Sequence, residues 1–242
     1  MILYGVCIGR DAKYEAYAAA GLRRIDASDR VLESRDNRSI FPAYNRFLDH
    51  AREERDLEAL VLLHDDLEIL DPAFEDKVRA HLADDVAILG TIGGRGPRSV
   101  RWSQARERYG RQPDAYYGPN DHGGGEAEVD MVDGCILILS PWAVHNLRFD
   151  AERFDGFHAY DADICMQARA AGRKVMVIEL DTFHHTKGGF GDLEAHRRAD
   201  DIFRRKWGLP RDPMRVRLGR RYPVAARVVS AVRRALRRAI RR

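Results

Sequence analysis

Residues 59–66 read Ala-Leu-Val-Leu-Leu-His-Asp-Asp, and this stretch decides the fold class. Its first five residues are apolar and have the length of a strand that is buried on both faces, as the strands of parallel sheets are. His64, Asp65 and Asp66 follow at once, and polar groups at the carboxyl end of such a strand lie where an α/β sheet opens to a ligand. Imidazole and carboxylate together suit a divalent ion such as Mn²⁺ or Mg²⁺, although an exposed turn explains the three residues equally well.

Strand-like and helix-like segments alternate on either side of this stretch. Hydrophobic spacing and cap residues predict strands over 2–9, 24–26, 86–92, 131–139 and 174–179, and helices over 11–22, 39–54, 160–171 and 193–207, with further helices beginning near residues 71 and 141. Between Gly93 and Glu128 the pattern disappears, and a loop of that length is usually functional or mobile. The alternation predicts an α/β fold with a mixed, mainly parallel sheet flanked by helices.

Length and composition exclude several classes of protein. The chain has 242 residues, of which 45% are hydrophobic and 33% charged, as in a globular protein rather than a disordered or collagen-like one. No run approaches the roughly 18–20 apolar residues of a membrane span, and the first residues lack the basic start of a signal peptide. Three distant cysteines exclude a disulfide scaffold and a structural zinc finger. We therefore expect a cytoplasmic protein.

Charge is divided unevenly along the chain. Residues 211–242 hold twelve arginines and one acidic residue, a net charge of +11, whereas residues 1–210 carry −8. From Tyr222 on, apolar residues recur at three- and four-residue steps between paired arginines, which predicts a basic amphipathic helix. We therefore expect one domain over 1–208 and a basic tail over 209–242.

Three kinds of partner suit this tail. An anionic membrane surface is favoured, because an apolar stripe with arginines is typical of interfacial helices and each basic residue adds about 1 kcal/mol. The protein would then lie on the inner face of the cell membrane. The acidic body or a second subunit comes next, and nucleic acid is the least expected, because the tail has no interleaved aromatic residues and no recognisable module.

A second group of polar residues stands at the start of the helix predicted over 160–171. The sequence Gly-Phe-His-Ala-Tyr-Asp-Ala-Asp at 156–163 places Asp161 and Asp163 in the first turn, where the helix dipole stabilises carboxylates. An ionised carboxylate can act as a general base, and ordinary helix capping is the competing interpretation. The histidine and aromatic residues ahead of the helix favour a functional role for these carboxylates over helix capping.

Two further segments carry groups suited to chemistry. His184 and His185 follow a predicted strand and precede a glycine-rich loop, so one imidazole could bind a metal ion while the backbone approaches phosphate. Lone histidines are usually structural, and the pair shifts the balance modestly toward function. Asp133 and Gly134 lie at the start of an apolar run, where a simple turn is the alternative interpretation.

The order of these features resembles that of a GT-A glycosyltransferase of the family-2 kind, in particular the bacterial branch named after a streptomycin-biosynthesis protein. The most specific stretch is FDAERFDGFHAYDADICMQARAAG at 149–172, in which FD, GFH, YDxD and RAAG have the spacing of that branch. SIFPAYN at 39–45 and LLHDDLEI at 62–69 also fit, and the resemblance covers about residues 1–208. It implies a Rossmann-like GT-A sheet.

The resemblance implies a metal site at the end of the strand 59–63. The three residues from His64 to Asp66 stand at the family's Asp-x-Asp motif, with Asp66 as the main contact of an Mn²⁺ or Mg²⁺ ion and His64 in place of the first acid. His185, or less readily His184, matches the histidine that completes the metal or diphosphate site. Because the first acid is replaced, metal dependence stays an open question.

The resemblance also implies a catalytic base and substrate contacts. Asp161 matches the catalytic base, the second residue of the family's Glu-Asp motif, and Tyr160 replaces the Glu. The implied contacts are Cys7, Ile8, Gly9, Asn45 and Asp65 for the donor nucleotide, and Asp133, Gly134 and Asp163 for the acceptor side, although Asp163 could instead support the helix start. Trp102, Tyr116 and Tyr117 suit stacking on a sugar face, with packing as an equal alternative.

The activity that the resemblance implies is inverting glycosyl transfer. A nucleoside-diphosphate sugar would bind across the carboxyl ends of the strands, the metal ion would neutralise the diphosphate, and Asp161 would take the proton of an acceptor hydroxyl. The loop at 93–128 could close over the donor. A lipid-linked or cell-envelope saccharide is one acceptor that fits. Hydrolysis of a nucleotide sugar, and a non-catalytic membrane or nucleic-acid adaptor on a degenerate GT-A fold, remain alternatives.

Overall fold

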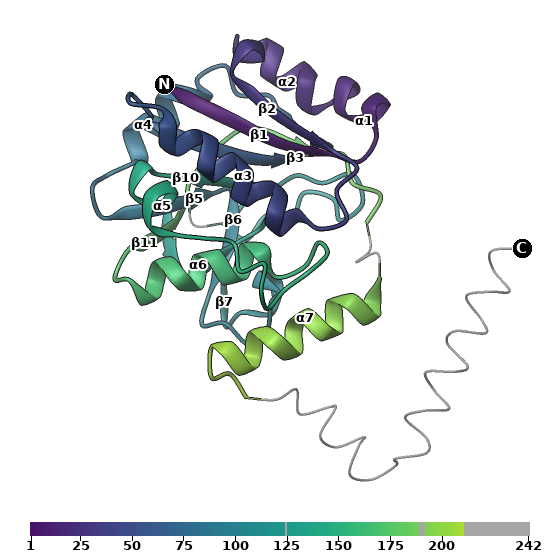
Figure 1. Cartoon of the computed structure of the whole chain (residues 1–242), viewed down its shortest axis with the longest axis vertical. Helices are drawn as coiled ribbons and strands as arrows, with labels where there is room; N and C mark the ends of the chain where they lie inside the picture. Colours follow the sequence, from purple (N-terminus) through teal and green to yellow (C-terminus); the bar gives the residue numbers. More distant parts are fainter. Residues whose placement is uncertain (124, 189–191, 211–242) are drawn as a thin grey trace, which may run out of the picture.

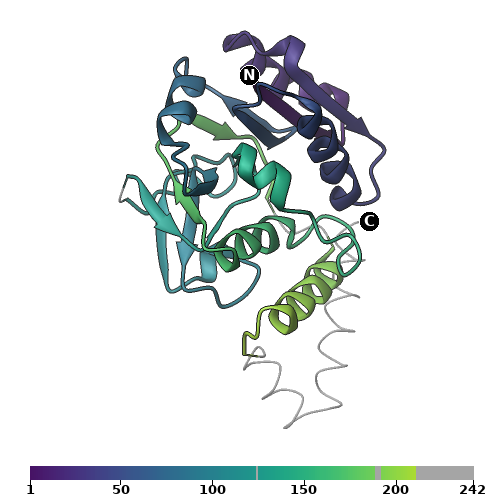
Figure 2. The same cartoon turned by 60° about the vertical axis from the view of Figure 1, so that its left-hand side comes forward.

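The computed structural model describes residues 1–123, 125–188 and 192–210. Their main element is a seven-stranded sheet with helices against both faces (Figures 1 and 2). The strands in spatial order are β2 (Val31–Arg35), β1 (Ile2–Ile8), β3 (Ala59–His64), β10 (Ile136–Leu139), β5 (Val86–Gly90), β11 (Lys174–Val177) and β8 (Ala127–Val129). Only β10 and β8 run against their described neighbours, so the predicted mixed, mainly parallel sheet is confirmed.

Helices form a layer on each face of the sheet. One layer consists of α1 (Asp11–Ala16), α2 (Ala18–Arg24) and α4 (Phe74–His81), and the other of α3 (Ile40–Glu53), α5 (Pro141–Asn146) and α6 (Tyr160–Ala170). Side chains of β1 alternate between the layers, so Tyr4 and Val6 pack in the first core and Leu3 in the second. Figure 1 shows α7 (Leu193–Lys206) next to α6, and Phe203 of α7 packs in the second core.

Close packing of α3 on β1 requires a glycine at position 5. A Cβ atom on Gly5 would lie 2.7 Å from Phe47 Cδ2 and 2.8 Å from Leu62 Cδ2. Contacts below 3.0 Å force the neighbours to move, and here both neighbours are fully packed core side chains. The glycine therefore lets an aromatic ring of α3 lie directly against the central strand.

The reversed direction of β10 brings a loop to the ligand-binding edge of the sheet. Ile136, the first residue of β10, pairs with Leu63 near the end of β3, and the His64 N–H donates to the Cys135 carbonyl at 3.0 Å. Because β10 is antiparallel to β3, its start lies at the carboxyl ends of the parallel strands. Asp133 and Gly134, which precede it, therefore lie beside the end of β3.

Several elements differ from the sequence predictions. The second strand forms at Val31–Arg35 rather than at 24–26, because Arg24 ends α2 and Asp26 adopts a left-handed backbone conformation with φ of 55°. The helix expected over 11–22 is interrupted at Tyr17. The segment 93–128, expected to be irregular, contributes β7 (Glu107–Gly110) and β8, and β7 pairs with β6 (Ile92–Arg95) in a small sheet.

The strand expected over 131–139 is interrupted. It divides into β9 (Met131–Val132), which joins the small sheet of β6 and β7, and β10, which joins the main sheet. The residues between β9 and β10 turn out of both sheets at the carboxyl edge.

The tail helix predicted from Tyr222 lies outside the described residues, and the domain boundary at 208/209 stays a prediction. No helix in the described part of the chain is long and apolar enough to cross a membrane.

Candidate functional site

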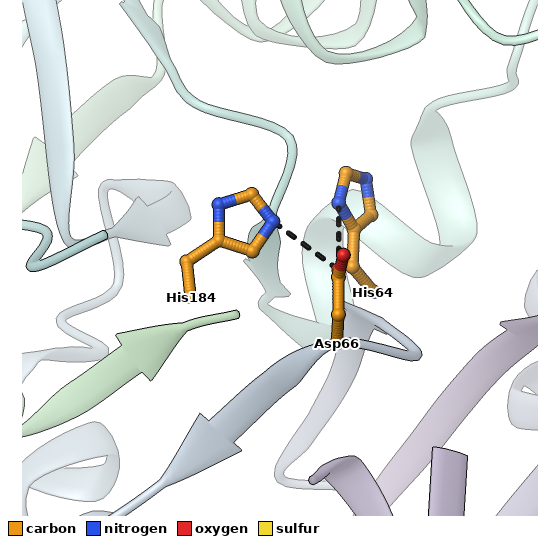
Figure 3. A group of neighbouring side chains, drawn as sticks. All are labelled: His64, Asp66 and His184. Atoms are coloured by element: carbon orange, nitrogen blue, oxygen red, sulfur yellow. Dashed lines mark ion pairs between the residues drawn. The ribbon is translucent and has the colours of Figure 1, made fainter. Parts of the chain in front are cut away.

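Three side chains suited to metal binding meet at the carboxyl edge of the sheet (Figure 3). His64 ends β3, Asp66 lies in the turn that follows, and His184 ends β12 (Thr182–His184). Asp66 Oδ1 lies 3.2 Å from His184 Nε2 and 3.9 Å from His64 Nδ1. One possible ligand atom from each residue lies within 4.8 Å of the other two, and we call this group the His-Asp-His cluster.

The cluster depends on two short strands that the sequence analysis did not predict. β12 pairs antiparallel with β4 (Leu67–Ile69), and this pairing sets His184 opposite Leu67, one residue after Asp66. The His185 N–H also donates to the Asp66 carbonyl at 2.8 Å. Backbone pairing therefore brings His184 to the end of β3, although the two segments lie far apart in the sequence.

Charge compensation sets the protonation states of the cluster. Burial by itself would raise the pKa of the Asp66 carboxyl, but the neighbouring His184, His64 and Lys13 outweigh it and hold the pKa well below its ordinary value. Burial and then the nearby His184 lower the pKa of His64. For His184, burial works in the lowering direction, but the carboxylate of Asp66 raises its pKa. Protonation of His184 would therefore compete with a metal ion for the ring nitrogen.

Asp114 contacts His184 from outside the cluster. Asp114 Oδ2 lies 3.1 Å from His184 Nδ1, and Asp114 Oδ1 accepts hydrogen bonds from the backbone N–H groups of Tyr116 and Tyr117 at 2.7 and 2.8 Å. Asp114 is only 6% exposed, so all these bonds are shielded from water. A carboxylate that binds the far nitrogen of a histidine is the usual support of a metal-binding imidazole.

Tyr160 contacts His64 as Asp114 contacts His184, at the ring nitrogen that points away from Asp66. Its hydroxyl lies 2.7 Å from His64 Nε2 and donates to the Gly134 carbonyl at 2.9 Å. A Cβ atom on Gly134 would lie 2.3 Å from the hydroxyl oxygen, so a residue with a side chain would displace the ring. The glycine and the tyrosine therefore fit each other.

His185 lies outside the His-Asp-His cluster. Its Nε2 lies 2.9 Å from Glu68 Oε2, and its ring stacks on Tyr17 with a centroid distance of 3.8 Å. Successive side chains of an extended segment point to opposite sides, so only one of two adjacent histidines can reach Asp66. The structure puts His184 there, which reverses the preference for His185 taken from the sequence.

A carboxyl group with a raised pKa lies beside the start of β10. Asp161 is in the first turn of α6, and its Oδ2 accepts a hydrogen bond from the Gly134 N–H at 3.1 Å. Burial and then the negative charge of Asp133 raise the pKa of Asp161 to about 7. A side chain that titrates near neutral pH is suited to proton transfer in either direction.

Trp102 orients Asp133 and does not offer its face to a sugar. Its indole N–H donates to Asp133 Oδ2 at 2.5 Å, while Asp133 Oδ1 accepts from the Cys135 N–H at 2.8 Å. The Trp102 side chain packs in the second core and is only 9% exposed. Of the aromatic residues considered for sugar stacking, Tyr116 and Tyr117 are the accessible ones, with exposed fractions of 63% and 53%.

Asp65 connects the end of β1 to the cluster. Its Oδ2 accepts from the backbone N–H groups of Gly9 and Arg10 at 2.9 and 3.3 Å. Its Oδ1 lies 2.7 Å from Lys13 Nζ, and the same ammonium lies 3.0 Å from Asp66 Oδ2. A positive group therefore stands at the second oxygen of Asp66, next to the loop expected to receive a nucleoside.

Three other residues implied for the donor have structural contacts. Cys7 pairs with His64 across the sheet, and burial raises the pKa of its thiol to about 12. Ile8 is 4% exposed and belongs to the first core. Asn45 binds the backbone of Phe149 twice, donating to its carbonyl at 2.8 Å and accepting from its N–H at 3.0 Å. Asn45 thus ties α3 to the segment after α5.

Asp163 also has a structural environment, at the contact between α6 and α7. It is 1% exposed, and it accepts hydrogen bonds from Lys206 Nζ at 2.8 Å and Trp207 Nε1 at 2.9 Å. Gln167 donates to it at 2.9 Å. All these partners are protein groups, so the alternative of support for the helices describes Asp163 better than a contact with an acceptor.

Lys13 and Asp114 were not predicted from the sequence as residues of the site. The sequence at 114–118 is Asp-Ala-Tyr-Tyr-Gly, in which an Asp before a turn that ends in glycine is a recognisable signal for a side chain capping the backbone. Nothing in that pattern indicates the contact with His184. Lys13 lies in the short helix α1, and no local pattern distinguishes it from an exposed lysine.

The fold and the site define an α/β protein whose polar groups gather beyond the carboxyl ends of its strands, where such proteins bind ligands. The chain belongs to the Glycosyltransferase like family, whose sequence profile matches residues 23–207. It is 37% identical over 201 residues to the Streptomycin biosynthesis protein StrF of Streptomyces griseus, an alignment that covers 81% of this chain and 71% of StrF. The predicted resemblance to bacterial family-2 glycosyltransferases is confirmed.

The chain also has two more distant similarities. The chain is 24% identical over 154 residues to the protein named ATP synthase subunits region ORF 6 of Fuscovulum blasticum, with 61% of this chain and 60% of that protein covered. Among solved structures, A197 from STIV superposes with a TM-score of 0.50 at 12% identity, covering 77% of this chain and 86% of that one. At that identity the structural match supports the fold alone.

Proposed function

We propose that this glycosyltransferase moves a sugar from a nucleoside-diphosphate sugar to an acceptor hydroxyl with inversion, using Asp161 as the general base. The observation behind the proposal is the position of Asp161, whose pKa is about 7, next to the peptide at Gly134 that also binds Tyr160 and, through it, the His-Asp-His cluster. A proton acceptor and a cation site thus lie on either side of one backbone segment. A metal-assisted transfer from a diphosphate would use both.

Three residues of the cluster would hold a divalent ion. The buried Nε2 of His184 makes no well-aligned hydrogen bond within the described residues and lies 3.2 Å from Asp66 Oδ1, so an ion beside the two atoms would bind both. His64 is 34% exposed, which leaves that side of the cluster open to phosphate oxygens. A divalent ion there would supply positive charge to stabilise the leaving diphosphate. Lys13 would place a second positive charge beside it.

Asp161 would act on the acceptor. In its ionised form it takes the proton of the acceptor hydroxyl while that oxygen bonds to the anomeric carbon and the bond from this carbon to the diphosphate oxygen breaks. Attack from the face opposite the diphosphate inverts the anomeric configuration. The negative charges of Asp133 and Asp161 also favour the positive charge that develops on the sugar.

Other parts of the site fit the two substrates. The backbone at Gly9 and Arg10, held by Asp65, forms the wall expected to face the nucleoside. Tyr116 and Tyr117 present exposed rings within three residues of Asp114, which binds His184. Rings of this kind suit stacking on a saccharide acceptor. A lipid-linked or cell-envelope saccharide on the inner face of the membrane fits the basic tail over 209–242, and this part of the proposal rests on sequence.

Replacement of the base tests the proposal. With a panel of nucleoside-diphosphate sugars and saturating Mn²⁺, Asp161→Asn should reduce turnover by about 10²–10⁴-fold while changing donor affinity only a few-fold. Asp155→Asn is the matched control, because Asp155 is an exposed aspartate shortly before the same helix. Full turnover by Asp161→Asn would show that the base is another group.

The same assay separates the alternatives left open by the sequence. Release of free sugar that no acceptor can redirect would indicate a hydrolase. Absence of binding by every nucleotide sugar would favour the adaptor, and binding of the full chain to anionic but not neutral vesicles would then identify the tail as its functional part. Product analysis showing retained anomeric configuration would refute inversion.

A further inference from the structure

Hydrogen bonding determines which ring nitrogen of His64 carries the proton. Tyr160 has one hydroxyl proton, and it donates that proton to the Gly134 carbonyl at 2.9 Å. At 2.7 Å from His64 Nε2 the hydroxyl oxygen can then only accept, so Nε2 carries the proton. In the neutral ring the lone pair lies on Nδ1, the nitrogen that faces Asp66 Oδ1 at 3.9 Å.

His184 is held in the opposite way. Asp114 is an acceptor, and its Oδ1 is already bound by the N–H groups of Tyr116 and Tyr117. Its Oδ2, 3.1 Å from His184 Nδ1, accepts the proton of that nitrogen. A neutral His184 therefore has its lone pair on Nε2, 3.2 Å from Asp66 Oδ1. Figure 3 shows both of these nitrogens directed toward Asp66.

We propose that Tyr160 and Asp114 are positioning residues that fix opposite tautomers of His64 and His184, and that the resulting site selects divalent transition-metal ions, such as Mn²⁺, Co²⁺ or Zn²⁺, against Mg²⁺. Two of its three protein ligands are imidazole nitrogens, which Co²⁺ and Zn²⁺ bind readily and Mn²⁺ binds more weakly, whereas Mg²⁺ is held mainly by oxygen ligands. The inference rests on the proposed function for the role of the ion in transfer. It goes further in naming the class of ion and the residues that set it.

The surroundings of Tyr160 support a positioning role. The side chain is 5% exposed, and its ring meets Tyr44 edge-on at a centroid distance of 5.5 Å. Gly134 leaves room for the hydroxyl, since a Cβ there would lie 2.3 Å from its oxygen. The ring is therefore held by packing at a place where its hydroxyl has just two partners among the described residues, His64 and Gly134.

Metal titration of the full chain tests the selection of the ion. By calorimetry with MnCl₂, CoCl₂ and MgCl₂ alone, the wild-type protein should bind Mn²⁺ and Co²⁺ at least tenfold more tightly than Mg²⁺. Tyr160→Phe should weaken Mn²⁺ binding by about 10–100-fold, as loss of such supporting groups typically does. Tyr4→Phe is the control, since Tyr4 is also buried and donates to a carboxylate, Glu75, but belongs to the first core.

Asp114→Asn should weaken Mn²⁺ binding by changing the tautomer of His184. The N–H groups of Tyr116 and Tyr117 need the amide oxygen, so the amide NH₂ group would face His184 Nδ1. That nitrogen would then have to accept, and the proton would move to Nε2, where it blocks the ion. Mn²⁺ affinity should fall by at least tenfold, with little change in Mg²⁺ affinity.

Histidine nitrogen NMR spectra of the metal-free protein report the tautomers directly. At a pH where both rings are neutral, we expect the Nε2–H tautomer for His64 and the Nδ1–H tautomer for His184. In Tyr160→Phe, His64 should no longer be held in the Nε2–H tautomer. The same tautomer on both rings, unchanged Mn²⁺ binding by Tyr160→Phe, or equal wild-type affinities for Mg²⁺ and Mn²⁺ would overturn the inference. A protein that binds Mn²⁺ as expected but transfers no sugar would instead refute the proposed function alone.

Discussion

Turnover should depend on pH through the ionisation of Asp161. Burial and the charge of Asp133 raise its pKa to about 7, and a general base must be ionised to act. From that pKa, about 9% of the enzyme carries an ionised base at pH 6 and about 91% at pH 8. Turnover should therefore rise about tenfold between these two values, which is far more than an ordinary aspartate would cause.

The assay is release of nucleoside diphosphate at saturating donor and acceptor, in buffers of constant ionic strength. Mn²⁺ must be saturating at each pH, because Asp66 raises the pKa of His184 and protons then compete with the ion in acid. Because turnover at saturation reports the base in the substrate complex, kcat/KM is measured at each pH as well, and its profile reports the base in the free enzyme, to which the pKa of about 7 belongs. Turnover that stays constant or falls from pH 6 to pH 8 would refute the assignment of Asp161.

A second perturbation tests the cause of the raised pKa. Asp133→Asn removes a neighbouring negative charge, so the midpoint of the profile should move to lower pH and the variant should keep a larger share of its maximal turnover at pH 6. Asp155→Asn, which changes an exposed aspartate, should leave the midpoint in place. An unchanged midpoint in Asp133→Asn would mean that burial alone raises the pKa.

Three further predictions concern stability. Since the folded-state pKa of Asp161 lies above the unfolded value, ionisation of Asp161 costs stability as pH rises from about 4 through 7; Asp161→Asn should therefore melt at a higher temperature than wild type at pH 8 but not at pH 4.5. Asp163→Ala leaves Trp207 Nε1 without its acceptor and Lys206 paired with Asp150 alone, and it should cost about 1–3 kcal/mol, with faster amide exchange in α7. Gly5→Ala should cost about 1–3 kcal/mol in urea unfolding, since its Cβ would overlap Phe47. A variant whose stability equals that of the wild type under the stated conditions would contradict the contact or the pKa shift from which its prediction was made.

Local sequence predicted the parts of the fold that depend on local hydrophobic pattern. The run at 59–63 is apolar without interruption and became β3, with His64 as its last residue. The helix at 39–54 was equally clear from its spacing. By contrast, nothing in the residues 136–139 indicates that β10 runs antiparallel to β3, because strand direction is set by the neighbours a strand pairs with.

The site was predictable in its residue types but not in its pairings. That Asp66 and a histidine belong together was implied by the resemblance to the family, but the choice between His184 and His185 depends on the register of β12 against β4. These strands are three residues each, too short for a periodic signal. For Trp102 the sequence left stacking on a sugar and simple packing equally open; its indole N–H is buried and needs an acceptor, and here it binds Asp133.

The antiparallel direction of β10 explains how one short segment can serve both halves of the proposed reaction. In an all-parallel sheet, Asp133 and Gly134 would start their strand at the edge remote from His64. Here Gly134 lies at the carboxyl edge, where its N–H binds Asp161 and its carbonyl binds Tyr160, which in turn contacts His64. The position of the proposed base is thus tied, through a single glycine, to the imidazole proposed to bind the ion. Because any movement of this glycine alters both hydrogen bonds, the fold couples the position of the proposed proton acceptor to that of the proposed cation site.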